Sequence, residues 1–402
     1  MPTTLIAHIP LLSGTYEITI ENQHIAALKP SAVETKLCAG PTLFDIQVNG
    51  YGGRTCRIPA PEKEDALAYI ARLLRERGIG WWMPTITTAS AEDLLMAFQC
   101  CGRALDADAD TAASIAGLHL EGPYISKVDG PRGAHGLEHV RPPDWDEVQR
   151  LQEACGGRIK LLTLAPEVEG AVPFIKKCIA VGIVVAMGHT DLDRDSLARA
   201  VDAGATLSTH LGNGAHDQVQ RHNNYLWYQL AEERIYASFI ADSQHLPQEC
   251  LYSMLRAKSF ERSVLVSDSV LLGGMKPGVY QVRGREIEML ESGRIVIPGT
   301  PNLAGSGSHL LQCVEFATAL GKIEHARAWA MASLNPANLM GMDDRLGLEV
   351  GKEASLTVYT LGQDGAQVEV VETWVAGRKV FDAARDERIV MPERPLDAAA
   401  PI

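Results

Sequence analysis

The sequence has few of the features that mark a secreted, membrane-bound or nucleic-acid-binding protein. Only 6% of its 402 residues are aromatic, no basic stretch offsets a net charge of −13, and the longest apolar runs are strand-length, as in Ile183–Met187. These features exclude a membrane span and argue against nucleic acid as a partner. The N-terminus also lacks the basic region and the long apolar region of a signal peptide, so we expect a cytoplasmic protein.

The cysteines lack the spacing of a metal site or a disulfide framework. None lies in a CxxC pair, and all eight are scattered along the chain, at Cys38, Cys56, Cys100, Cys101, Cys155, Cys178, Cys250 and Cys313. Such a distribution is typical of reduced, structural thiols. We therefore expect no zinc–cysteine site.

The middle of the chain alternates between strand-like runs and helical patterns. Amphipathic helical patterns occur at Glu64–Arg77, Pro173–Val181, Arg194–Ala203, Asn224–Glu233 and Pro247–Lys258. Eight apolar, β-rich runs accompany them: Leu43–Val48, Trp81–Thr85, Ile115–Leu120, Lys160–Leu164, Ile183–Met187, Ala205–Thr209, Ile235–Ala241 and Val264–Val266. Eight strands joined by helices predict an α/β protein built on a (β/α)8 barrel of the TIM type. A doubly wound open sheet is the alternative, but no GxGxxG follows the first strand.

Both ends of the chain predict short strands separated by turns. These strands are Tyr16–Ile20, His24–Leu28, Ala354–Leu361, Val368–Trp374 and Lys379–Phe381. We expect residues 1–40 and 345–402 to form one small β-sandwich domain beside a catalytic barrel at residues 41–344. A β-hairpin insertion is expected near residues 278–301, with a turn at Glu291–Gly293, and the Pro/Ala-rich end after Met391 predicts a frayed tail.

Polar side chains follow several predicted strands, at the end of the barrel where barrel enzymes place their chemistry. Glu121, His189 and His210 end three strands, and Asp268 ends the last one. One histidine in such a place is usually structural, whereas four polar residues together predict a site. Two imidazoles and a carboxylate are typical ligands of one catalytic Zn²⁺ or Fe²⁺ with an open position for water, whose pKa the metal lowers. Asp268 is then free to act as general base and acid.

Seven short segments resemble the N-acetylglucosamine-6-phosphate deacetylase family of the amidohydrolase superfamily. In the same order as in that family, and over nearly the whole chain, they read LHLEGPY (118–124), GHT (188–190), THLGNG (209–214), FIADSQH (239–245), LVSD (265–268), LAGS (303–306) and NPA (335–337). The resemblance implies hydrolysis of the acetyl group of an N-acetylhexosamine 6-phosphate, with N-acetylglucosamine 6-phosphate as the first candidate, in amino-sugar catabolism. It also implies a homodimer.

The resemblance assigns roles to individual residues. It implies that Glu121, His189 and His210 bind the metal, that Asp268 is the catalytic aspartate, and that His135 helps to polarise the acetyl carbonyl. It further implies substrate contacts, with the backbone at Asn213 and Gly214, Arg221 and His245 beside the phosphate and Leu303 beside the acetyl methyl group.

The sequence departs from related enzymes in three places. Many amidohydrolases have His-x-His after the first strand to hold a second metal, and this chain has Gln47-Val48-Asn49, so we expect a single metal. The loop after His210 reads GNGAHDQVQRHNNYLW, which keeps Arg221 in changed surroundings. His216 and His222 are alternatives to His245 there, and the helix that follows carries Trp227 and Tyr228.

Several other functions remain open at this point. A related amidohydrolase acting on the galactosamine epimer, on an unphosphorylated N-acyl sugar or on an N-acyl amino acid would share the metal and Asp268. A catalytically silent sugar-phosphate-binding paralogue would have no need of a titrating carboxylate beside a metal. A barrel isomerase of sugar phosphates would show a glycine-rich loop after strands seven and eight, where Gly273-Gly274 gives only weak support.

Overall fold

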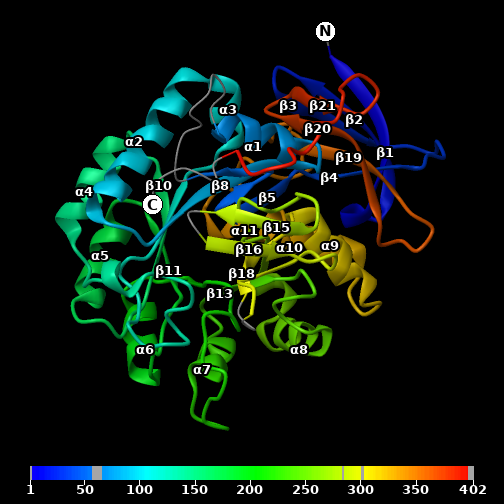
Figure 1. Cartoon of the computed structure of the whole chain (residues 1–402). Coiled ribbons are helices and arrows are strands. Elements are labelled where there is room, and N and C mark those ends of the chain that lie inside the picture. The colour runs from blue at the N-terminus through cyan, green and yellow to red at the C-terminus, as the bar shows by residue number, and fades with distance from the viewer. Residues whose placement is uncertain (1, 57–65, 283–284, 300–302, 397–402) are drawn as a thin grey trace.

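The computed structural model describes residues 2–56, 66–282, 285–299 and 303–396. Its centre is an eight-stranded parallel sheet in the order β5-β8-β9-β10-β11-β12-β13-β14 (Figure 1). A bridge between Val48 and Ser269 brings the first strand beside the last, so the sheet nearly closes into a barrel. The prediction of a (β/α)8 barrel is therefore confirmed. The eight strands are Leu43–Val48, Ile79–Thr87, Leu118–Glu121, Ile159–Leu164, Val184–Met187, Leu207–Ser208, Tyr236–Ile240 and Ser263–Val266.

Helices cover the outside of the barrel, as α2, α4, α5 and α6 show in Figure 1. Ser90, Asp144, Asp193 and Asn224 begin α2, α4, α6 and α7 with side chains that accept backbone N–H groups. No helix in the described ranges is long and apolar enough to span a membrane. The helices are α1 (Ala66–Arg75), α2 (Ala91–Ala107), α3 (Ala109–Ser114), α4 (Trp145–Ala154), α5 (Ala171–Ala180), α6 (Arg194–Asp202), α7 (Tyr225–Ala231), α8 (Gln248–Lys258), α9 (Leu310–Ala319), α10 (His325–Met331) and α11 (Leu334–Leu339).

Strands from both ends of the chain form one seven-stranded sheet. Its order is β21-β20-β19-β4-β1-β2-β3, and β4 joins the two halves by pairing parallel with β1 and antiparallel with β19. Apolar side chains of both halves, among them Ile18 and Trp374, share one core. The strands are β1 (Thr3–Ile9), β2 (Gly14–Glu21), β3 (His24–Pro30), β4 (Leu37–Pro41), β19 (Leu356–Leu361), β20 (Val368–Val375) and β21 (Arg378–Asp382).

The insertion after the last barrel strand is larger than the predicted hairpin. It is a four-stranded antiparallel sheet of β15 (Gly278–Val282), β16 (Arg285–Met289), β17 (Arg294–Val296) and β18 (Leu303–Ser306). The predicted turn at 291–293 joins β16 to β17, and Gly293 has a positive φ of 79° there. The LAGS segment is the fourth strand, because it pairs with β17. Its last residue, Ser306, also bridges Ser269 at the end of the barrel.

The segment that follows the last strand is packed along the barrel. The Ile389 N–H donates to Glu76 Oε1 at 2.9 Å, and the Leu396 N–H donates to the Gly53 carbonyl at 2.8 Å. Gly53 belongs to the hairpin of β6 (Gly50–Tyr51) and β7 (Arg54–Thr55), directly after the first barrel strand. The prediction of a frayed tail after Met391 is therefore wrong for residues 392–396, and residues 397–402 lie outside the described ranges.

Candidate active site

Three of the predicted site residues share an unusual backbone conformation beyond the ends of barrel strands. His189 lies after β11 with a φ of 51°, His210 after β12 with a φ of 30°, and Asp268 after β14 with a φ of 48°. A positive φ costs a residue with a Cβ on the order of 1–3 kcal/mol and is concentrated at functional sites. The surrounding barrel holds all three residues in these sharp turns.

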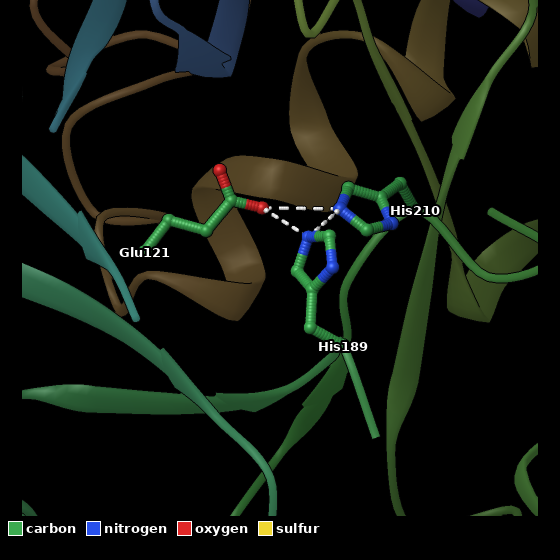
Figure 2. A group of neighbouring side chains, drawn as sticks. All are labelled: Glu121, His189 and His210. Carbon is green, nitrogen blue, oxygen red and sulfur yellow. Dashed lines mark hydrogen bonds and ion pairs between the residues drawn. The ribbon is translucent and has the colours of Figure 1, made fainter. Parts of the chain in front are cut away.

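Glu121, His189 and His210 converge at the carboxyl end of the barrel (Figure 2). Glu121 Oε1 lies 3.2 Å from His189 Nε2 and 3.0 Å from His210 Nε2, and the two imidazole nitrogens are 3.1 Å apart. All three residues are buried. Ligand atoms with these separations suit one cation held by bonds of about 2.0–2.2 Å. The cluster therefore fits a single divalent metal ion.

The neighbours of His189 orient its ring. His189 Nδ1 lies 3.1 Å from the Pro131 carbonyl oxygen, so Nδ1 carries the hydrogen and Nε2 presents its lone pair to the cluster. Gly214 lies against the same ring, where a Cβ would come within 2.8 Å of Nδ1. His135 Nε2 lies 3.2 Å from His189 Nε2, and His135 Nδ1 lies 2.6 Å from Thr88 Oγ1. The loop after β9 thus brings His135 to the edge of the cluster.

The carboxylates of the site differ in their electrostatics. Burial opposes ionisation of Glu121, but the adjoining imidazoles of His189 and His210 outweigh it and hold the pKa of Glu121 well below its ordinary value. Burial, reinforced by the Glu121 charge, raises the pKa of Asp268 to about 7. Burial also lowers the pKa of His135 to about 3. The site therefore combines an ionised ligand, a carboxyl group that can exchange a proton near neutral pH, and a neutral imidazole.

Two amides occupy the place of the His-x-His motif. Gln47 Nε2 donates to Glu121 Oε1 at 2.9 Å, and Asn49 Nδ2 donates to Asp268 Oδ1 at 2.7 Å. The Asp268 N–H also donates to the Gln47 carbonyl at 3.0 Å. The first and last barrel strands therefore hold the ligand carboxylate and the titrating carboxylate in fixed relation to each other.

The residues predicted to contact the sugar phosphate differ in their surroundings. Asn213 and Gly214 lie in the loop after His210, and the Asn213 N–H donates to the His210 carbonyl at 2.9 Å. Leu303 begins β18 and is half-buried. Arg221 is exposed, and within the described residues its side chain has no hydrogen-bond partner, whereas its carbonyl accepts from Trp227 Nε1 at 3.1 Å.

The side chain of His245, by contrast, is largely buried. Its Nδ1 lies 2.7 Å from Asp242 Oδ2, and its side chain is only 8% exposed. The structure therefore brings Asn213, Gly214 and His245 into ordered loops near the end of the barrel and leaves Arg221 on the surface.

Sequence reasoning missed the residues that hold the site in place. Thr88 orients His135, Asp242 orients His245, and the Pro131 carbonyl orients His189. Asp242 carried a detectable signal, because it stands at a strand end three residues before His245. Thr88 and Pro131 carried none, since a threonine hydroxyl and a backbone carbonyl are too common to stand out.

The sequence is similar to known proteins over most of its length. The model of the Amidohydrolase family matches residues 40–380. An N-acetylgalactosamine-6-phosphate deacetylase of Escherichia coli O157:H7 is 30% identical over 374 residues, which cover 90% of this chain and 94% of that protein. An N-acetylglucosamine-6-phosphate deacetylase of Danio rerio is 31% identical over 87% of this chain and 85% of its own length.

A solved structure has a similar fold. The crystal structure of N-acetyl-D-glucosamine-6-phosphate deacetylase from Mycobacterium smegmatis superimposes with a TM-score of 0.82 at 27% identity. The superposition covers 94% of this chain and 100% of the other chain. The barrel and the additional sheets are thus shared as one arrangement.

Proposed function

The chain belongs to the amidohydrolase family, and on that basis we propose that it removes the acetyl group from N-acetylglucosamine 6-phosphate. The products are glucosamine 6-phosphate and acetate, as expected of an enzyme of amino-sugar catabolism. One observation carries the proposal: the cluster of Glu121, His189 and His210 lies beside a separate carboxylate, Asp268, that is suited to proton transfer. The deacetylases similar to this chain supply the substrate class.

Glu121, His189 and His210 would hold one divalent transition metal, for which zinc is the first candidate and iron the second. A bound divalent metal lowers the pKa of a water molecule and polarises the acetyl carbonyl. Gln47 and Asn49 offer amide groups in place of imidazoles and already donate to the two carboxylates. For this reason we propose a single metal per chain.

Asp268 and His135 supply the proton transfers and the carbonyl contact. Asp268 takes a proton from the attacking water and later gives it to the departing amine, which leaves poorly unless it is protonated. The raised pKa of Asp268 suits both steps. His135 donates from Nε2 to the carbonyl oxygen as negative charge develops there, while Thr88 holds its other nitrogen.

Arg221 and His245, with the backbone N–H groups near Asn213 and Gly214, would bind the phosphate. Arginine offers a planar pair of donors that suits a phosphate, and the exposed Arg221 side chain is free to turn toward a ligand. Leu303, at the start of β18, would contact the acetyl methyl group.

We propose in addition that the enzyme is cytoplasmic and forms a homodimer. Two exposed apolar side chains are available for a contact between subunits, since Leu137, in the loop after β9, is 50% exposed and Trp227, in α7, is 55% exposed. Light scattering should then give twice the chain mass of 43.5 kDa.

The decisive experiment is acetate release from N-acetylglucosamine 6-phosphate and from the unphosphorylated sugar. Wild type should prefer the phosphorylated sugar, and Arg221→Ala should lower kcat/KM for that sugar by about ten- to a hundred-fold, because a hydrogen bond to a charged group contributes roughly 1.5–3 kcal/mol. The unphosphorylated sugar should be hydrolysed equally by both. No preference in wild type would refute the substrate class, and a preference that survives in Arg221→Ala would move the phosphate site elsewhere.

The galactosamine epimer is a second candidate substrate. The similarity to an N-acetylgalactosamine-6-phosphate deacetylase, at 30% identity over 374 residues, favours testing it. The two epimers differ only at one hydroxyl, and the changed loop after His210 directly follows a proposed metal ligand. The ratio of the two kcat/KM values, measured in one assay, decides between them.

A further inference from the structure

The carboxylate of Asp242 organises the loop after β13. Its Oδ1 accepts the Gln244 and His245 N–H groups, both at 2.9 Å, and its Oδ2 contacts His245 Nδ1 at 2.7 Å and Ser306 Oγ at 3.1 Å. Ser243, in the same turn, has a positive φ of 64°. The Asp242 side chain is only 2% exposed. A buried carboxylate with four donors around it has no lone pair left for solvent.

This contact fixes the identity of the free nitrogen of His245. Burial opposes ionisation of Asp242, but the hydrogen bond from His245 outweighs it, so the pKa of Asp242 lies below its ordinary value and the group is an acceptor. His245 Nδ1 must then carry a hydrogen, and Nε2 is the nitrogen available to a ligand. A second hydrogen, on Nε2, lets the ring donate to a phosphate while the Asp242 carboxylate balances its charge.

Ser306 connects the same carboxylate to the insertion. Its carbonyl accepts the Val270 N–H at 3.1 Å, two residues after Asp268, and its backbone bridges Ser269. Ser306 is the last residue of β18, and Leu303 is the first. One short strand therefore runs from a residue proposed to contact the acetyl methyl group to a residue that holds the carboxylate behind His245.

We propose that Asp242 is a positioning residue that holds His245 for the phosphate of the substrate and ties it through Ser306 to the strand that contacts the acetyl group. The inference rests on the proposed function, since it takes His245 as a phosphate contact. Its consequence is that the phosphate end and the acetyl end of the substrate are held at a fixed separation by one connected set of hydrogen bonds. Asp242 acts on binding of the phosphorylated sugar and leaves the chemical step to Asp268.

Asp242→Asn is the most informative variant. The asparagine oxygen can still accept the two backbone N–H groups, so the turn is kept, but its amide would donate to His245 Nδ1 and force the hydrogen onto Nε2. We expect KM for N-acetylglucosamine 6-phosphate to rise about five- to tenfold, with kcat nearly unchanged, because the neutral ring still donates from Nε2 but lacks the positive charge that strengthens a hydrogen bond to phosphate. Hydrolysis of the unphosphorylated sugar should not change. Nitrogen NMR of the histidine rings should show a hydrogen on His245 Nδ1 in wild type and none there in the variant.

Ser306→Ala tests the connection separately, because it removes one of the four donors and leaves the turn and the tautomer intact. It should raise KM for the phosphorylated sugar severalfold, and the double variant should lose less than the product of the two single effects, as expected for residues in one network. Multiplicative effects would overturn the proposed connection. If Asp242→Asn unfolds, Ser306→Ala and the wild-type tautomer still decide.

The outcomes separate this inference from the proposed function. If wild type shows no preference for the phosphorylated sugar, the function fails and the role of Asp242 in phosphate binding fails with it. If wild type shows the preference and Asp242→Asn keeps it with an unchanged KM, the function stands and the positioning role is refuted. A wild-type His245 ring with no hydrogen on Nδ1 would also refute it.

Discussion

His189, His210 and Asp268 owe their placement to a backbone conformation that their residue types do not favour. Each has a positive φ beyond the end of a barrel strand. Glycine would adopt these turns more easily, but glycine has no side chain to bind a metal or carry a proton. The barrel therefore stabilises the strained turns, and the gain is that three side chains from distant segments meet at one point.

The first prediction at the residue scale concerns the metal. His189→Ala and His210→Ala should each lose the bound metal and the activity together, because each removes one of three ligands. Elemental analysis of the purified proteins checks this, with wild type expected to hold about one metal per chain. His24→Ala, an exposed histidine of the terminal sheet, is the matched control. Full metal content in both site variants would contradict the assignment.

The second residue-scale prediction concerns proton transfer. Asp268→Asn should retain the metal and the fold, since Asn49 and the Gln47 carbonyl still contact this position. Its kcat should fall by roughly 10²–10⁴-fold, the usual contribution of general acid–base catalysis. Steady-state kinetics with a parallel metal determination measure this. Asp343→Asn, at an exposed aspartate after α11, serves as the control. A variant that keeps more than about a tenth of wild-type kcat would remove Asp268 from the mechanism.

At the scale of elements, helix α11 contains the NPA segment. This segment is remote from the metal ligands in sequence, but it supports the strand that leads to Asp268. Asn335, in this short helix, is buried, and its Nδ2 donates to the Phe260 and Ser263 carbonyls, both at 2.7 Å. These carbonyls lie at the start of β14, the strand that leads to Asp268. The helix thus fixes the entry of the last barrel strand.

The third prediction follows from this contact. Asn335→Ala should lower the free energy of unfolding by about 2–3 kcal/mol, because it leaves buried carbonyl groups without donors. Thermal or denaturant unfolding measures the loss. Asn338→Ala, an exposed asparagine of the same helix, should change stability by less than about 0.5 kcal/mol. Equal effects of the two substitutions would show that the hydrogen bonds of Asn335 are unimportant.

At the scale of the whole molecule, the two ends of the chain come together beside the barrel. They meet in the seven-stranded sheet, and the segment after β21 then returns along the barrel to the hairpin after the first strand. The packing there is close, because a Cβ on Gly53 would lie 3.1 Å from Pro392 and 3.3 Å from the Leu396 nitrogen. This segment therefore stabilises the hairpin directly after Asn49, which donates to Asp268.

The fourth prediction tests that segment. Deletion of residues 390–402 should lower Tm by about 1–3 °C, as expected for a loss of roughly 1–2 kcal/mol in a chain of this size, and should expose residues 50–56 to proteolysis. Calorimetry and limited digestion check both effects. Deletion of residues 397–402 alone is the reference, so that the difference between the two Tm values is due to residues 390–396. An unchanged Tm in the longer deletion would mean that residues 390–396 contribute no stability.

The sequence by itself determined the barrel and the chemical types at its strand ends. Apolar periodicity and β-branched runs are local properties, so the eight strands could be read directly, and Glu121, His189 and His210 could be recognised because each follows such a run. The tertiary structure alone decided which groups meet. Asn49 and Asp268 are 219 residues apart, and Gln47 and Glu121 are 74 apart. Such contacts leave no local pattern because they form only when the first and last strands of the barrel come together. For the same reason, only the structure could show that Arg221 is exposed, that Asp242 holds His245 and that residues 392–396 are packed.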